Sequence, residues 1–313
     1  MAMKRFRVAE DSMRPSLSPG DEVVATDARA ARVGDIVVFL HPGRDDFWMV
    51  KRRVDPPGAI GPDQAWVMSD DPSVTVADSR TLGPVPLDRL WTVVNRLDDE
   101  SFVEASHLLS AEDKALAGVV AAHGLPGFWR RPSGLSTLIL LVLEQQVSLE
   151  SGAAVFRRLR EGAGGIRPES LLAMGADGVR GVGVTRQKTT YILDLAQAVV
   201  TGALDLASLE NRSAAEARRS LLELKGIGPW TADAYLLSAL GHLDVFPVGD
   251  RALQVGAGEV LGMSQTPDGA QLEIISQPWR PLRAVAARLI WHAYLTVRGR
   301  VEPDHGTPIP ERA

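Results

Sequence analysis

The stretch that most constrains this chain is Leu221–Asp250, where two apolar helical patterns meet at a glycine-rich turn. The turn reads Gly226-Ile227-Gly228, and Pro229 follows it. Glycines two positions apart permit a tight reversal and leave backbone N–H groups uncovered by side chains. Proline is tolerated as a first helical residue, where its missing N–H has no partner to lose. The turn and the helix start therefore predict an uncharged socket suited to a phosphate group.

Composition excludes several kinds of chemistry. The 313 residues contain no cysteine, which excludes disulfides, a thiolate nucleophile and cysteine-ligated metal clusters. The six histidines show no metal-ligand spacing, so we expect no metal site. Neither an apolar run long enough to span a bilayer nor the apolar core of a signal peptide is visible. We therefore expect a soluble, cytoplasmic monomer without a membrane partner.

The charge balance limits how this chain can bind nucleic acid. Lys and Arg number 34 against 39 Asp and Glu, a formal net charge of −5. That sign is wrong for a protein that binds DNA through bulk charge. DNA contacts must then be local, through backbone N–H groups, helix N-termini and clustered basic residues. The candidate basic residues are Arg157, Arg158, Arg160, Arg186 and Lys188.

The residue composition and the spacing of apolar residues change once along the chain, and this change predicts two domains. Residues 1–97 carry short alternating or apolar runs between Pro, Gly and Asp turns, a pattern typical of a small all-β domain. Residues 98–112 are polar and weakly patterned, and we expect a linker there. Residues 113–300 are rich in Ala, Leu and Arg at helical spacing and predict an all-α domain. Residues 301–313 contain three prolines and predict a tail.

The expected elements follow from these patterns. The strands are expected over Glu22–Ala25, Asp35–Leu40, Trp48–Val54, Ala65–Met68 and Leu90–Leu97. The helices are expected over Ala111–His123, Gly134–Gln146, Glu150–Glu161, Pro168–Met174, Arg186–Thr201, Ala214–Leu224, Pro229–Leu240, Arg251–Leu261 and Arg283–Val297. The fold class is therefore multidomain, with separate α and β parts.

Several motifs of the helical part, in one order, resemble a known family. KGIGPWTA followed by FPVGD resembles the helix-hairpin-helix and catalytic aspartate of the base-excision DNA glycosylase superfamily, closest to its 3-methyladenine glycosylase branch. Further matches are Glu144-Gln145-Gln146-Val147-Ser148, Val184-Thr185-Arg186-Gln187-Lys188-Thr189, and Trp279-Arg280-Pro281 before Leu289-Ile290-Trp291. The resemblance covers about residues 113–300. It implies a nucleoid-associated repair enzyme that acts on double-stranded DNA containing a damaged base.

The resemblance assigns Asp250 the catalytic role, in which its carboxylate stabilises oxocarbenium-like charge on the deoxyribose and orients water. The alternative is an N-cap for the helix expected over Arg251–Leu261, and the two roles are compatible. Relatives with β-lyase activity carry an amine nucleophile on the second residue after the hairpin glycine. That residue is Trp230 here, and indole forms no Schiff base. We therefore expect a monofunctional enzyme that leaves an abasic site.

Aromatic residues are candidates for a pocket that receives an extruded base. Trp230 and Trp291 lead, because an electron-rich ring face attracts a cationic alkylated base such as 3-methyladenine or 7-methylguanine. Such a base is already a good leaving group and needs no general acid. The alternative is that these tryptophans belong to the core. Weaker candidates are Tyr294, Trp129 and Phe128.

Three groups of residues are expected to contact DNA. By resemblance, the loop containing Gln145 and Gln146 is the wedge that fills the gap left by the flipped base, against the alternative of two surface glutamines. Arg186 and Lys188 are phosphate contacts or else a solvated helix start. The hairpin contributes Gly226, Ile227, Gly228 and Thr231. Its carbonyls are candidates for a monovalent cation, and we expect no other cofactor.

The β part carries a second resemblance, over roughly residues 6–96. Its blocks are Asp11-Ser12-Met13-Arg14-Pro15, Gly34-Asp35-Ile36-Val37-Val38-Phe39, Val50-Lys51-Arg52 and Asp78-Ser79-Arg80-Thr81-Leu82-Gly83-Pro84-Val85. They resemble the signal-peptidase and SOS-repressor clan of Ser/Lys peptidases. The resemblance implies Ser12 as nucleophile and Lys51 as its general base. A basic lysine must be neutral, so we expect an apolar wall around it, for which Trp48 and Val50 are candidates.

This chain departs from the peptidase pattern in two places. The membrane anchor of signal peptidases is absent, which suggests a soluble peptidase. Ser69-Asp70-Asp71 stands for the family's Gly-Asp-Asn box, and Val76 stands where the family has an auxiliary serine, with Thr75 beside it. Val103-Glu104-Ala105 before Ser106 has the small or apolar residues at −3 and −1 that such enzymes accept, so self-cleavage there is a further hypothesis.

Our interpretation is a DNA glycosylase fused to a Ser/Lys peptidase that has its own protein substrate. Two alternatives stay open. In one, the helical domain is a non-catalytic DNA reader that guides the peptidase. In the other, the β domain is an inactive scaffold that supports the glycosylase.

Overall fold

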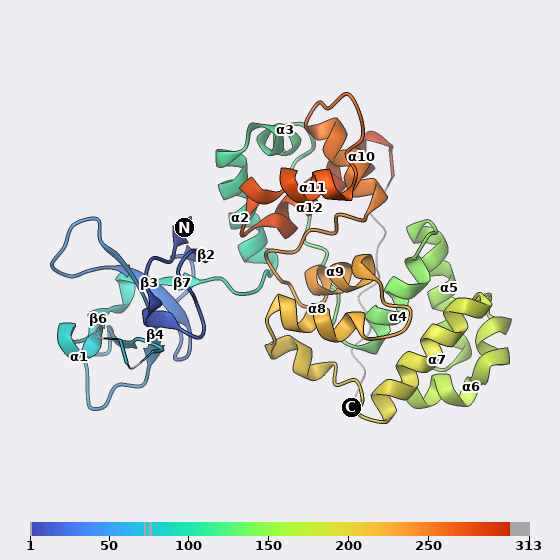
Figure 1. Cartoon of the computed structure of the whole chain (residues 1–313), viewed down its shortest axis with the longest axis horizontal. Coiled ribbons are helices and arrows are strands. Elements are labelled where there is room, and N and C mark those ends of the chain that lie inside the picture. Colours follow the sequence, from blue (N-terminus) through green and yellow to red (C-terminus); the bar gives the residue numbers. More distant parts are fainter. Residues whose placement is uncertain (1, 72, 75–76, 301–313) are drawn as a thin grey trace. The chain divides into compact units, whose positions relative to one another are not determined.

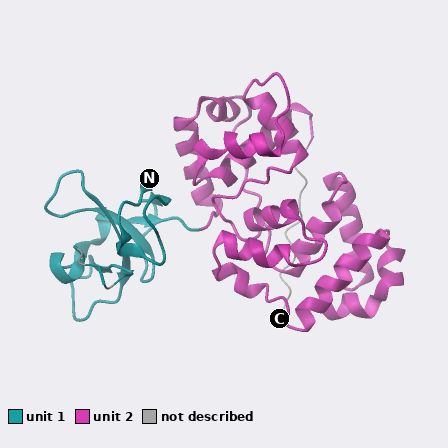
Figure 2. Ribbon diagram, viewed as in Figure 1, with its two compact units in different colours: residues 1–95 teal, residues 96–313 magenta. Residues whose placement is uncertain are grey.

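The computed structural model describes residues 2–71, 73–74 and 77–300. The chain divides into two compact units, unit 1 from Met1 to Asn95 and unit 2 from Arg96 to Ala313 (Figure 2). The tail that we predicted over residues 301–313 lies outside the described residues. In the described part of the chain, no helix is long and apolar enough to cross a membrane.

Unit 1 is built on one seven-stranded sheet, with strand order β1-β2-β7-β3-β4-β5-β6 and antiparallel neighbours (Figure 1). The strands are β1 (Met3–Arg7), β2 (Glu22–Thr26), β3 (Ile36–Leu40), β4 (Trp48–Val54), β5 (Gln64–Met68), β6 (Val85–Pro86) and β7 (Trp91–Val93). A 3-10 turn, η1 (Asp11–Met13), and a one-turn helix, α1 (Ser79–Leu82), join strands. The predicted β character of this region is confirmed.

Strand β3 shows how the sheet forms its two apolar faces. Successive side chains on a strand point to opposite sides. Val37 and Phe39 therefore enter one buried cluster, with Met49 on the neighbouring strand. Ile36 and Val38 enter the other cluster on the opposite side. Because both faces are covered, β3 reads as a continuous apolar run rather than as an alternation.

Unit 2 is helical, as predicted. Its helices are α2 (Asp99–Glu112), α3 (Lys114–His123), α4 (Leu135–Glu144), α5 (Leu149–Gly162), α6 (Pro168–Gly181), α7 (Arg186–Val200), α8 (Ala214–Leu222), α9 (Pro229–Ser238), α10 (Arg251–Val260), α11 (Gly269–Ile275) and α12 (Arg283–Val297). Helices α4 to α9 pack with one another, and α2, α3 and α10 pack with α12 (Figure 1). The chain crosses from the first group to the second between α9 and α10, the stretch that ends at Asp250.

The linker that we predicted over residues 98–112 is wrong, because this segment forms α2. Asp98 caps the helix in a reciprocal capping box with Ser101. Phe102, Ala105 and Leu109 are buried at helical spacing. The apolar stripe is only three residues wide among acidic and polar neighbours, so the helical period is weak in the sequence.

The same helix argues against self-cleavage before Ser106. Ala105 and Ser106 are fully buried, and the Ser106 hydroxyl donates to the carbonyl oxygen of Phe102. A peptide bond in a buried helix cannot enter a protease in the extended form that cleavage requires. The helix would first have to unfold.

Other predicted helix bounds also need correction. The helix expected to start at Ala111 begins at Lys114, because Asp113 ends α2 and caps α3 with its side chain. Helix α6 continues past Met174 to Gly181 through a kink at Gly175, whose φ is 67°. Helix α11 was not predicted at all; its length of seven residues gives little periodic signal.

Candidate functional site

The hairpin between α8 and α9 has the shape that its glycines predicted. Gly226 has φ 86°, and a Cβ there would lie 2.2 Å from the Tyr191 ring, so no other residue fits. Gly228 has ordinary backbone angles, and a Cβ there would meet nothing within 4 Å. The two glycines thus have different structural roles. Gly226 permits close packing against α7, whereas Gly228 leaves open space in front of the helix start.

Two hairpin residues that we expected to bind DNA face inwards. Ile227 is buried, so its side chain belongs to the core and only its backbone remains available. Thr231 is 1% exposed, and its hydroxyl accepts a hydrogen bond from the Gln145 amide at 2.8 Å. The Thr231 side chain thus has a structural role, and DNA binding at this position stays a prediction for its backbone N–H.

The Asp250 carboxylate accepts three hydrogen bonds at the junction of the two helix groups. One carboxylate oxygen accepts from the backbone N–H of Leu253 at 2.7 Å and from Trp291 Nε1 at 3.0 Å. The other accepts from Trp230 Nε1 at 2.7 Å. Asp250 is thus the N-cap of α10, as one of our two interpretations predicted. A helix cap alone does not require the two indole contacts. They come from α9 and α12, and each fixes one oxygen of the Asp250 carboxylate.

The two leading tryptophans contact Asp250 through their edges. Trp291 is 8% exposed, and one of its faces stacks on Trp129, with ring centroids 5.3 Å apart and an interplanar angle of 27°. The Arg288 guanidinium lies 4.2 Å from the Trp129 ring centroid. Trp291 is therefore a buried residue that also contacts Asp250, and its role in a base pocket stays a prediction. Trp230 and Trp129 are half-buried.

The weaker pocket candidates lie in different surroundings. Tyr294 packs against Gly256 in the second turn of α10, and the Arg298 guanidinium lies 3.9 Å from its ring centroid. Its contacts are thus one helical turn away from those of Trp291. Phe128 stacks on Phe102, with ring centroids 5.3 Å apart. Phe128 thus has a packing partner and Tyr294 has a cation over its ring, and a pocket role for either stays a prediction.

The loop after α4 separates its two glutamines. Gln145 is half-buried, and its Nε2 donates to the carbonyl oxygen of Gly226 at 2.9 Å and to Thr231 Oγ1 at 2.8 Å. Gln146 is exposed with φ 58°, and Val147 is 48% exposed. The wedge prediction is therefore corrected for Gln145, whose side chain points to the hairpin. Gln146 remains a candidate.

Lys188 is corrected as well. Its Nζ donates to the carbonyl oxygens of Leu143 and Gln145, both at 2.8 Å. These are terminal carbonyls of α4, where a helix has no partners of its own and carries partial negative charge. Burial lowers the pKa of Lys188. Arg186, at the start of α7, is exposed and keeps its predicted availability for phosphate.

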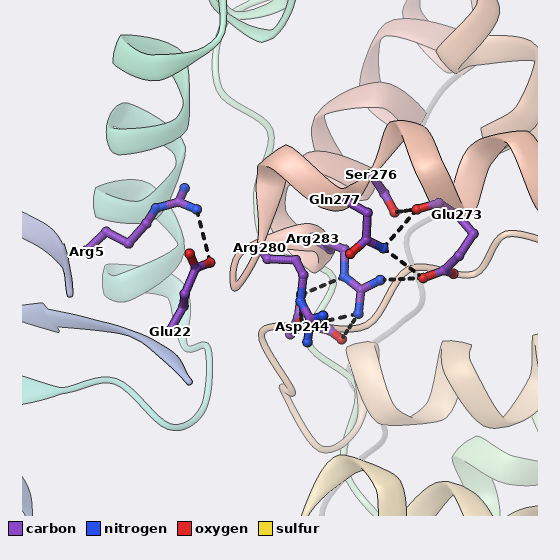
Figure 3. A network of polar contacts seen from close by, with 8 residues as sticks. All are labelled: Arg5, Glu22, Asp244, Glu273, Ser276, Gln277, Arg280 and Arg283. Atoms are coloured by element: carbon purple, nitrogen blue, oxygen red, sulfur yellow. Dashed lines mark hydrogen bonds and ion pairs between the residues drawn. The ribbon is translucent and has the colours of Figure 1, made fainter. Parts of the chain in front are cut away.

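Two sets of ion-pair contacts in unit 2 were not predicted. Arg283 in α12 donates to Asp244 at 2.6 Å and to Glu273 at 3.0 Å, and Arg280 also donates to Asp244 (Figure 3). Asp244 lies in the segment that leads to Asp250, so the network ties that segment to α12, which carries Trp291. Arg283 and Asp244 lie 39 positions apart in the sequence, and no local pattern connects them.

The second network lies beneath the loop after α4. Arg131 donates to both oxygens of Glu144, at 3.1 and 3.2 Å, and both side chains are buried. Burial raises the pKa of Glu144, although the Arg131 charge opposes the shift. A Cβ at Gly152 would lie 2.8 Å from Glu144 Cγ, so the small residue on α5 makes room for the pair. The pair fixes the last turn of α4, from which the glutamine loop departs.

In unit 1 the structure brings Ser12 and Lys51 together. Lys51 Nζ donates to Ser12 Oγ at 2.9 Å, and each residue is 4% exposed. Burial lowers the pKa of Lys51, while the charge of Asp78 opposes the shift. The backbone N–H of Asp71 donates to the Ser12 carbonyl oxygen at 3.1 Å. A buried amine beside a serine hydroxyl is the arrangement that proton transfer from the hydroxyl requires.

The prediction that Trp48 and Val50 form the apolar wall around Lys51 is wrong. Trp48 and Val50 pack into the cluster on the other face of the sheet, because residues at odd separation along β4 point to opposite sides. Lys51 shares its face with Met49, which belongs to the first cluster. This error was avoidable, since the alternation is visible in the sequence.

The acidic loops around Ser12 are held by arginines. Asp78 is fully buried and accepts from the backbone and guanidinium of Arg80 and from Ser69. Asp70 accepts from two nitrogens of Arg52, at 2.7 and 2.6 Å. Thr75 and Val76 lie outside the described residues. Among the described residues, no group of three or more His, Asp or Glu side chains is placed to hold a metal ion.

Comparisons with known proteins concern the helical part. A family model described as HhH-GPD superfamily base excision DNA repair protein matches residues 139–281. An alkylbase DNA glycosidase-like protein of Schizosaccharomyces pombe is 29% identical over 125 residues, which are 40% of this chain and 59% of that protein. The chain thus spans about three fifths of this curated relative's length.

Two solved structures are similar over almost their whole length. A DNA-3-methyladenine glycosidase from Bacillus halodurans is 31% identical with a TM-score of 0.54, and the match covers 63% of this chain and 91% of that one. A 3-methyladenine DNA glycosylase of Schizosaccharomyces pombe, in complex with abasic DNA, is 25% identical with a TM-score of 0.57, and the match covers 62% and 97%. The chain belongs to the HhH-GPD superfamily of base excision DNA repair proteins.

Proposed function

We propose that unit 2 is a monofunctional DNA glycosylase that hydrolyses the N-glycosidic bond of alkylated bases in double-stranded DNA. The observation that carries the proposal is Asp250, whose carboxylate is held by Trp230, Trp291 and the first turn of α10. It stands 22 residues after an uncharged hairpin whose Gly228 opens onto free space. A fixed negative charge beside a phosphate socket suits a reaction in which positive charge develops on the sugar.

The chemistry needs little beyond this carboxylate. As the bond from C1′ to the base breaks, its electrons leave with the base and the sugar becomes oxocarbenium-like. The Asp250 carboxylate stabilises that charge and orients the water that adds to C1′. A cationic base such as 3-methyladenine or 7-methylguanine leaves as a neutral molecule, so no acid is required. The names of the relatives, which are 3-methyladenine glycosylases, support this substrate class.

Lyase chemistry is not expected. The second residue after Gly228 is Trp230, which has no amine. The nearby lysines are engaged elsewhere. Lys188 binds the end of α4, and Lys225 pairs with Asp194 at 3.3 Å. The product is therefore an intact strand with an abasic site.

The test is release of free base from duplex DNA methylated with dimethyl sulfate. We expect the wild type to release 3-methyladenine or 7-methylguanine and Asp250→Asn to release each at least about a hundredfold more slowly. Ser12→Ala is the matched control and keeps the wild-type rate. Strand breaks should appear only after alkali treatment. A wild type that binds damaged duplex without releasing base would instead support the non-catalytic DNA reader.

We further propose that unit 1 is a serine hydrolase acting on peptide bonds. The observation that favours it is the 2.9 Å contact between Lys51 Nζ and Ser12 Oγ in a buried setting. In the acylation step Ser12 Oγ attacks the peptide carbonyl carbon while neutral Lys51 takes the hydroxyl proton. Lys51 then passes the proton to the leaving amine, and water hydrolyses the ester.

The peptidase is tested with a defined pool of peptides and mass spectrometry of the products. We expect new termini with the wild type and none with Ser12→Ala or Lys51→Met. Asp250→Asn is the control that must keep this activity. If all four proteins leave the pool intact, the inactive-scaffold interpretation of unit 1 is favoured.

A further inference from the structure

Gln145 links two surface elements that the glycosylase would present to DNA. Its amide group donates to the Gly226 carbonyl oxygen at 2.9 Å and to Thr231 Oγ1 at 2.8 Å, so both amide protons are used on the hairpin side. Its backbone ends α4, and the next residue, Gln146, adopts a left-handed conformation on the surface. One residue thus spans the hairpin and the loop of residues 146–148.

Helix α7 contacts both Gln145 and the hairpin. Lys188 Nζ donates to the carbonyl oxygen of Gln145 and to that of Leu143. The ring of Tyr191, one turn later, packs directly against Gly226. The first turns of α7 therefore contact both ends of the link. The half-buried lysine also places a basic group at the negative end of α4.

We propose that Gln145 is a positioning residue that fixes the spacing between the hairpin and the loop of residues 146–148. The proposal rests on the glycosylase function of unit 2. Extruding a base requires that the phosphate be held while another side chain fills the space left in the stack. Gln145 joins the hairpin and the loop of residues 146–148 into one rigid surface. A phosphate bound at the hairpin therefore places Gln146 at the gap in the base stack. Gln145 itself does not touch the reacting atoms.

The proposal predicts a loss that depends on whether the damaged base is paired. A duplex with one enzymatically incorporated 7-methylguanine opposite cytosine requires the pair to be opened. The same base opposite a tetrahydrofuran abasic analogue has no pair to open. Gln145→Leu removes both amide donors at similar volume. We expect its single-turnover rate to fall about tenfold on the paired duplex and less than about twofold on the unpaired one.

Further variants locate the effect in the link. Thr231→Val removes one acceptor and should show a smaller loss with the same dependence on pairing. The double variant should be no slower than Gln145→Leu alone, because both changes break the same contact. Gln197→Leu, the same substitution at an exposed position on α7, is the matched control with the wild-type rate on both duplexes.

The outcomes separate the possible failures. Equal losses on the two duplexes, or no loss on either, would overturn the positioning role of Gln145. Additive losses in the double variant would show that Gln145 leaves the hairpin and acts in the DNA, which also contradicts the proposal. If the wild type releases base from neither duplex, the glycosylase proposal itself fails, and the role of Gln145 fails with it.

Discussion

The site of Asp250 in unit 2 and that of Lys51 in unit 1 hold ionisable groups in opposite ways. Asp250 receives three N–H donors on its two oxygens, from a helix start and two indoles. The Lys51 ammonium nitrogen faces the Ser12 hydroxyl at 2.9 Å in a buried position, and that burial lowers its pKa. The first environment gives each carboxylate oxygen at least one N–H donor. The second favours a neutral amine by removing water.

The functional group of unit 2 stabilises its domain, whereas the functional group of unit 1 destabilises its domain. A carboxylate that caps a helix stabilises the fold while it serves the chemistry, so its loss harms both. A buried amine costs stability at neutral pH, so a variant that lacks it gains stability while losing activity.

The largest expected effect is acid destabilisation through His242. The ring is buried, and its Nδ1 lies 2.7 Å from Arg96 Nη1, so it accepts from the guanidinium and must stay neutral. Burial, together with the Arg96 charge, lowers the pKa of His242 to about 3. The unfolded ring titrates near pH 6.5, so the unfolded state binds the proton more readily below that pH. We expect this residue alone to remove about 3 kcal/mol from the free energy of unfolding between pH 7 and pH 4.

The measurement is urea unfolding of the full chain at both pH values, followed by circular dichroism at 222 nm. His242→Gln keeps an acceptor for Arg96 but has no proton to gain. Its stability should fall less than that of the wild type by about the same 3 kcal/mol. Parallel losses in the two proteins would show that other groups control the acid response.

Asp250→Ala should be the next largest effect on stability. The change removes the N-cap of α10 and leaves the indole N–H groups of Trp230 and Trp291 without their acceptor. We expect unit 2 to lose about 2 kcal/mol in urea unfolding. Asp250→Asn keeps an acceptor oxygen and should lose less than half as much. A fully stable Asp250→Ala would mean that the carboxylate has no structural role, contrary to its cap geometry.

The sequence predicts most where the signal is local. The Gly226 and Gly228 spacing, Pro229 after it and Asp250 just before α10 together specify the hairpin and the cap. Each depends on backbone rules that act within a few residues. Trp230 and Trp291 were singled out on other grounds, because they lie in motifs that resemble the glycosylase family and their ring faces attract a cationic base.

Errors arose where a side chain's partner is distant in the chain. Gln145 meets Thr231 across 86 residues, and Lys188 meets Leu143 across 45. A glutamine that serves as an exposed wedge and one whose amide binds another part of the protein look the same in the sequence. Only the fold distinguishes them. The misplaced wall of Lys51 was different, because strand alternation excludes Val50 without any structure.

A smaller effect should follow from removing one donor to Asp250. Trp291→Phe keeps the ring that stacks on Trp129 but loses the N–H that lies 3.0 Å from the carboxylate. We expect base release from methylated duplex to slow about tenfold, since a hydrogen bond to a charged group contributes roughly 1.5 kcal/mol. Trp279→Phe is the matched control. It loses an equal N–H bond, to Asp113, away from Asp250, and should keep the wild-type rate.

The smallest effect has the opposite sign and belongs to unit 1. Lys51→Met replaces a buried amine with an apolar chain of similar length, and we expect unit 1 to gain about 1 kcal/mol at pH 7. The folded pKa lies below the unfolded value, so the wild type becomes more stable as pH rises towards the unfolded pKa. The gain should therefore shrink between pH 7 and pH 10, as measured by urea unfolding. Lys114→Met, at an exposed position, should change stability by less than about 0.5 kcal/mol at either pH. A destabilised Lys51→Met would mean that the amine is held as a charge, and the contrast with Asp250 would disappear.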